Sequence, residues 1–96
     1  MFDLNNIITR FFEVKINGIV LEVEPPTVKT LKRLMEVKKT EDIEAFIEVL
    51  SRILSKNRQN KDISIDFVEQ MTLDQMNELS EAYFLWLGKV KNHPNL

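Results

Sequence analysis

The stretch that decides the fold is Phe12-Glu13-Val14-Lys15-Ile16-Asn17-Gly18-Ile19-Val20-Leu21-Glu22-Val23. Both halves alternate apolar and polar residues, as half-buried strands do. Asn17-Gly18 joins them and suits a type I′ turn, in which both central residues need a positive φ. The stretch therefore predicts an antiparallel β-hairpin over residues 11–24. A two-residue loop places these six apolar side chains on one face: Phe12, Val14, Ile16, Ile19, Leu21 and Val23.

An isolated hairpin is only marginally stable in water, so this one must pack on the rest of the chain. Pro25-Pro26 ends the second strand because proline cannot continue the hydrogen-bond ladder. Helical spacing of apolar residues then predicts helices over about 28–38, 41–56, 65–71 and 73–87. The apolar stripe expected on the second of them contains Ile43, Phe46, Ile47, Leu50, Ile53 and Leu54. We expect an α+β fold, with an N-terminal antiparallel hairpin on a bundle of three to four helices.

Several side chains predict where these helices begin and end. The expected N-caps are Thr27, Thr40, Ser64 and Thr72. Glu41 and Asp42 would lie in a first turn, where the helix dipole favours anions. Thr72 and Gln75 have the spacing of a capping box. Gly88 suits the C′ position that ends a helix.

Length and composition limit the class of protein. The 96 residues form one domain, which we place at residues 11–88 between a lead-in (1–10) and a loose tail (89–96). The 13 basic and 15 acidic residues give a net charge of −2, which argues against nucleic acid as the main ligand. No cysteine is present, as is common in a reducing cytoplasm. No signal peptide or membrane-length apolar run is found, so we expect a cytoplasmic protein without a membrane partner.

No pattern of catalytic or metal-binding residues is found in the sequence. The single histidine, His93, lies in the expected tail, where nothing fixes its geometry. The carboxylate pairs Glu41/Asp42 and Glu78/Glu81 fall on outer faces or first turns of helices. We therefore predict no enzyme activity, no catalytic residue, no metal site and no cofactor.

The end of the last helix departs from simple amphipathicity. Residues 83–87 read Tyr-Phe-Leu-Trp-Leu and are apolar nearly all round the helix. Such a turn is either buried on every side or offered to a partner or a second copy of the chain. Phe84, Leu85 and Trp86 are the candidate partner-binding residues.

Two further surfaces are candidates. Phe11 and Val20 lie on the reverse face of the hairpin. The edges of the hairpin could accept a strand from another chain. Alternatively, the charged side chains on the reverse face keep the protein monomeric. Five basic residues also lie along the first helix and at its end. They suggest an alternative function, a small dimeric regulatory domain that binds DNA or another anion. They are Lys29, Lys32, Arg33, Lys38 and Lys39.

The order of these elements resembles the small tail assembly chaperones of long-tailed bacteriophages and related prophages. The resemblance covers roughly Phe11 to Leu87. It is carried by Val14-Lys15-Ile16-Asn17-Gly18, Pro25-Pro26-Thr27-Val28, Leu31 to Val37, Glu41-Asp42-Ile43-Glu44, Asp62-Ile63-Ser64-Ile65-Asp66-Phe67-Val68-Glu69 and Met71-Thr72-Leu73-Asp74-Gln75-Met76.

This resemblance implies a non-enzymatic role in the host bacterial cytoplasm. Members of that family bind the tape measure protein, keep its apolar helical segments in solution and help recruit the major tail protein. They are absent from the mature virion. The apolar last turn is a physically sensible place to hold an amphipathic client helix.

Overall fold

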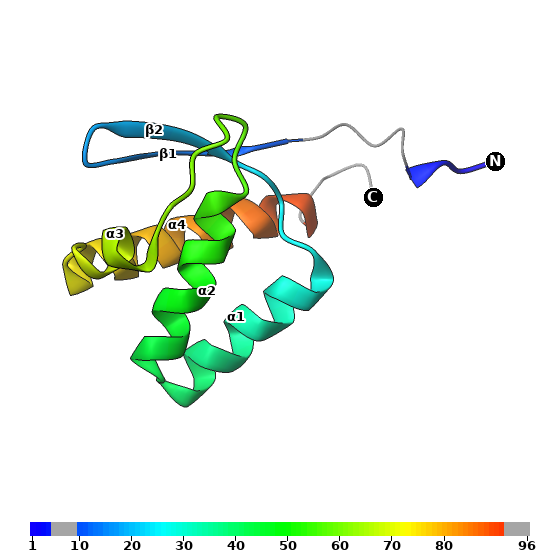
Figure 1. The fold of residues 1–96 in the computed structure, drawn as a ribbon. Coiled ribbons are helices and arrows are strands. Elements are labelled where there is room, and N and C mark those ends of the chain that lie inside the picture. The colour runs from blue at the N-terminus through cyan, green and yellow to red at the C-terminus, as the bar shows by residue number, and fades with distance from the viewer. Residues whose placement is uncertain (5–9, 92–96) are drawn as a thin grey trace.

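The computed structural model describes residues 1–4 and 10–91, with the hairpin first and the helices after it (Figure 1). Its elements are β1 (Phe12–Ile16), β2 (Ile19–Val23), α1 (Val28–Thr40), α2 (Ile43–Ser55), α3 (Ile65–Glu69) and α4 (Leu73–Lys91). The two strands form one antiparallel sheet, and the hairpin packs on the helices. This architecture confirms the predicted α+β class.

The hairpin has the predicted turn and register. Asn17 and Gly18 have φ angles of 49° and 83°, as a type I′ turn requires. Ile16 pairs with Ile19, Val14 with Leu21, and Phe12 with Val23. Leu21 and Val23 are fully buried, so the face predicted to be apolar is the one that meets the helices.

The outer edge of β2 is covered by the connector between α2 and α3. The Glu24 N–H donates to the Lys56 carbonyl (2.8 Å), and the Arg58 N–H donates to the Glu22 carbonyl (3.0 Å). The Glu22 N–H donates to Oε1 of Gln59 (2.8 Å). The expectation that both strands are open edges is therefore wrong for the C-terminal half of β2, because these polar residues bond the outward groups of Glu22.

The helix α1 ends later, and α2 begins later, than predicted. Lys38 and Lys39 occupy the last turn of α1, where the helix dipole favours cations. Thr40 belongs to that turn, and its hydroxyl donates to the Val37 carbonyl (3.2 Å). Glu41 adopts a left-handed conformation (φ 58°), and Asp42 accepts from the Ala45 N–H as the N-cap of α2. The predictions that Thr40 caps this helix and that Glu41 and Asp42 lie in its first turn are wrong, because the first turn begins at Ile43.

Asp42→Ala should lower the free energy of unfolding by about 1 kcal/mol, because an N–H of the first turn of α2 loses its acceptor. Thr40→Ala is the matched control and should change it by less than about 0.5 kcal/mol, as exposed substitutions usually do. Urea denaturation of both variants measures the difference. A larger loss for Thr40→Ala would contradict the assignment of the cap.

The other N-terminal signals are confirmed. Thr27 caps α1 and Ser64 caps α3. Thr72 and Gln75 form the reciprocal capping box of α4, with hydrogen bonds of 2.9 and 3.0 Å.

The C-terminal signal is not confirmed, because α4 continues through Gly88 to Lys91. Glycine within a helix costs only about 1 kcal/mol relative to alanine, so one glycine does not by itself end a helix. Residues 89–91, predicted as part of the tail, are therefore helical. The remaining tail, which includes His93, lies outside the described residues.

The helix α4 supports the hairpin from below in the view of Figure 1, whereas α1 and α2 extend away from the sheet as a pair. The Phe12 ring lies 5.3 Å from that of Tyr83 and 5.6 Å from that of Trp86. On α2 the predicted apolar stripe is shifted, since Ile43 is 49% exposed and Val49 is buried. The core therefore lies where the hairpin, α2 and α4 meet.

Candidate functional site

Three consecutive residues near the end of α4 have different surroundings. Leu85 is 66% exposed. Phe84 is half-buried, with Nζ of Lys38 at 4.8 Å from its ring centroid. Trp86 is half-buried on the hairpin side, so Phe84 and Leu85 are the pair that faces away from the sheet.

Trp86 belongs to an aromatic cluster with the hairpin. Its ring stacks on Tyr83 at 5.8 Å, and the Arg10 guanidinium lies 4.1 Å from its centroid. Arg10 also donates from Nη1 to the Trp86 carbonyl (2.9 Å). These contacts give the indole a structural role, so it is less available to a partner than Leu85 is.

A groove of about 470 Å³ adjoins Phe84 and Leu85, and we call it the three-helix groove. It is lined by Lys38 of α1, Phe46 of α2, and Asn77, Ser80, Glu81, Phe84 and Leu85 of α4. Its aromatic walls, Phe46 and Phe84, come from helices that are distant in sequence. The apolar helix end and this groove therefore form one continuous surface.

Ser80 is a buried polar residue of the three-helix groove. The residue is 4% exposed, and its hydroxyl has no hydrogen-bond partner among the described residues. A buried polar group without a partner is costly, and a ligand can satisfy it. The surface thus combines an exposed leucine, two aromatic rings and one unsatisfied hydroxyl.

Phe11 and Val20 lie elsewhere, on the reverse face of the hairpin. The Arg58 guanidinium is 4.9 Å from the Phe11 ring centroid. Val20 is 56% exposed and pairs with Lys15 across the hairpin. The five predicted partner-binding residues therefore do not form one surface.

The sequence does not predict the roles of three residues, which are Phe46, Ser80 and Asn57. Phe46 appeared in the sequence only as one member of an apolar stripe, and Ser80 as an ordinary helix residue. Asn57 is 4% exposed inside a polar connector, and its side chain bonds the carbonyls of Leu54 and Lys61 at 2.7 and 2.8 Å. No local pattern in the sequence indicates any of these roles.

The basic residues of α1 are interleaved with carboxylates. Arg33 pairs with Glu36 at 3.0 Å, and Arg52 of the adjacent helix α2 pairs with Glu48 at 3.1 Å. All four side chains are at least half exposed. A phosphate backbone would have to compete with these pairs, so this surface fits the DNA or anion alternative poorly.

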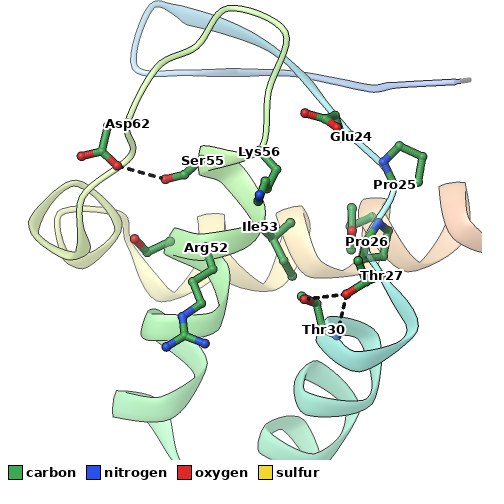
Figure 2. Close-up of a pocket in the computed structure, with 12 residues that line it drawn as sticks. Glu24, Pro25, Pro26, Thr27, Thr30, Arg52, Ile53, Ser55, Lys56 and Asp62 are labelled. Carbon is green, nitrogen blue, oxygen red and sulfur yellow. Dashed lines mark hydrogen bonds between the residues drawn. The ribbon is translucent and has the colours of Figure 1, made fainter.

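A second cavity, of about 470 Å³, lies beside Pro25 and Pro26 (Figure 2). Its polar groups largely serve the fold: Thr27 and Thr30 bond each other at the start of α1, and the Ser55 hydroxyl donates to the Ile63 carbonyl. Figure 2 shows the Arg52 guanidinium turned away from the two prolines. These groups do not converge on a point where a reacting atom could lie.

Tyr83 also lines the cavity beside the prolines and is 3% exposed. Its hydroxyl has no hydrogen-bond partner among residues 1–4 and 10–91. Burial raises the pKa of Tyr83 to about 12, and the nearby Arg10 charge opposes the rise. Burial also lowers the pKa of Arg10, which the tyrosine partly restores.

The raised pKa of Tyr83 makes stability depend on pH. Between its unfolded pKa of about 10 and its folded pKa of about 12, the folded state holds more protons, so stability should fall as pH rises. Tyr83 is the only tyrosine, so its phenolate absorbance measures the titration directly. Tyr83→Phe should remove this part of the alkaline loss. A titration midpoint near pH 10 in the folded protein would contradict the burial of the hydroxyl.

Metal sites and membrane spans each have defined structural requirements. Within residues 1–4 and 10–91, no three His, Cys, Asp or Glu side chains are placed to hold a metal ion. In the same part of the chain, no helix combines the length and apolar composition needed to cross a bilayer.

No protein-family model matches the chain, and no curated protein or solved structure matches it either.

Proposed function

We propose that this protein is a phage tail assembly chaperone that binds apolar helical segments of a tape measure protein, without enzyme activity. The observation that carries the proposal is the apolar surface formed by Leu85 and the three-helix groove. An exposed leucine beside two aromatic rings is typical of surfaces that bind the apolar face of a helix. The resemblance in element order from Phe11 to Leu87 supplies the class of client.

The residues of this surface suit contact with one face of a client helix. Phe46 and Phe84 offer half-buried rings, which supply contact area at low entropic cost. Lys38 and Glu81 at the rim can meet charges on either side of an amphipathic helix. In this role the chain would act in the host bacterial cytoplasm during tail assembly, with the major tail protein as a second partner, and would not remain in the virion.

Co-expression with the tape measure protein from the same genome tests the proposal. We expect the tape measure protein to remain in the soluble fraction with this chain and to aggregate without it. An unrelated small α+β protein expressed at the same level is the control. A tape measure protein that is equally soluble in all three cultures, or that never co-purifies with this chain, would contradict the proposal.

A further inference from the structure

In the part of the chain that the structure describes, the strand β1 has an open edge. In a hairpin with a two-residue turn, Ile16–Ile19, Val14–Leu21 and Phe12–Val23 are the pairs that exchange hydrogen bonds. The backbone N–H and C=O groups of Glu13 and Lys15 therefore point away from β2. No residue in the described part of the chain bonds these outward groups.

The hydrogen bonds at the opposite edge support this assignment of inward and outward backbone groups. The same hairpin geometry directs the backbone groups of Glu22 outward from β2, and Arg58 and Gln59 bond them there. Among residues 1–4 and 10–91, the fold thus bonds the outward groups of Glu22 on one edge of the hairpin and leaves those of Glu13 and Lys15 on the other edge without a partner. An open edge is a template for strand addition.

There is room for another strand beside β1. An open groove of about 550 Å³ runs between β1 and one face of α4. Leu79 and Ala82 are among the α4 residues that line it, while Asp74 and Glu78 make it unfavourable for an acidic segment. Leu79 is already buried within the chain, whereas Ala82 is exposed, so an added strand with an apolar helix-facing side would cover Ala82.

We propose that the strand that binds there is β1 of a second copy of this chain. The copies would pair antiparallel about a two-fold axis at Val14, and the two hairpins would form a four-stranded sheet. In each copy Phe12 and Ile16 stay buried against that copy's own helices, so the half-buried Val14 is the helix-facing side chain that the pairing would cover. The interface is isologous, as two-fold symmetry requires, and two-fold dimers are the commonest homo-oligomers.

Charge selects this register. Glu13 faces Glu22 within its own hairpin, and Lys15 faces Val20, so neither has an opposite charge directly across from it. In antiparallel pairing centred on Val14, Glu13 of each copy lies opposite Lys15 of the other copy, so two pairs of opposite charge form. Moving the two-fold axis by one residue would set Glu13 opposite Glu13, or Lys15 opposite Lys15. Opposite charges across a strand pair stabilise it, and like charges destabilise it.

Charge-reversal variants of the full chain test the proposal by sedimentation equilibrium. We expect the native protein to dimerise, and Glu13→Lys or Lys15→Glu alone to weaken the dimer about tenfold or more, because both cross-strand pairs become repulsive. Mixing the two single variants should restore a dimer, since each cross-strand pair would again join a lysine to a glutamate. The double variant E13K/K15E should also dimerise. Both native side chains are exposed, so the core is unchanged.

Two controls separate this interface from others. Glu69→Lys, an equal charge change at the end of α3, should leave the dimer intact. Leu85→Glu should also leave it intact, because client binding at the three-helix groove is a separate proposal. A native chain that is monomeric at every concentration, single reversals without effect, or a mixture that fails to dimerise would each overturn the proposal. So would loss of the dimer in Leu85→Glu.

Discussion

Phe12→Ala is expected to lower the free energy of unfolding by about 3–5 kcal/mol, the loss typical of a buried phenylalanine. Phe12 is 8% exposed and joins the hairpin to α4 through the rings of Tyr83 and Trp86. A two-stranded sheet is marginal without such support. Removing the ring should therefore weaken the packing of the whole hairpin as well as leave a cavity. Urea denaturation followed by circular dichroism measures the change.

Phe11→Ala is the matched control, because it removes the same side chain from the adjacent position. Phe11 is only half-buried and lies under the Arg58 guanidinium, outside the core. We expect a loss of less than about 1.5 kcal/mol, since a partly exposed ring buries less apolar area. Equal losses for the two variants would show that the hairpin does not depend on its contact with α4.

Under the proposed function, Leu85→Glu is expected to weaken binding of the tape measure protein about 30-fold or more, which corresponds to roughly 2 kcal/mol at an interface centre. The substitution places a carboxylate beside Phe84 and the three-helix groove, where an apolar client face would have to desolvate it. Stability should change little, because Leu85 is 66% exposed. Titration of the purified client segment measures the affinity.

Leu73→Glu provides the control for that variant. Leu73 lies at the other end of α4 and is 63% exposed, so the two changes match in chemistry and in exposure. We expect its affinity to stay within about threefold of the native value, since scattered exposed leucines need no partner. If both variants bind as the native chain does, the three-helix groove is not the docking surface.

Local features of the fold could be predicted from sequence because their physical causes are local. The Asn17-Gly18 turn fixes its own φ angles, and a turn of two residues fixes the register. The caps at Ser64 and Thr72 depend on neighbours three residues away. The predicted cap at Thr40 is wrong because Asp42 offers an equally good acceptor two residues later. The predicted helix end at Gly88 is wrong because a single glycine costs a helix too little to end it.

Features that depend on distant contacts could not be predicted. The closure of the β2 edge by Asn57 and its neighbours requires the connector to return to the sheet, which no local pattern indicates. The three-helix groove requires a particular placement of Phe46 of α2 against Phe84 of α4. Sequence alone indicates that residues 83–87 depart from simple amphipathicity, and the structure buries Tyr83 while leaving Leu85 exposed. Which of these residues face the hairpin and which face solvent was settled only by the packing of Trp86.

The most direct test of client binding by apolar contact is a calorimetric titration of the chain with a tape measure segment, at low and at high salt. Apolar client binding should be saturable, with a negative heat-capacity change and an affinity that salt alters by only a few-fold. Affinity that falls steeply with salt would instead indicate an electrostatic ligand site such as the basic face of α1. That result, or no binding at either salt concentration, would contradict client binding by apolar contact.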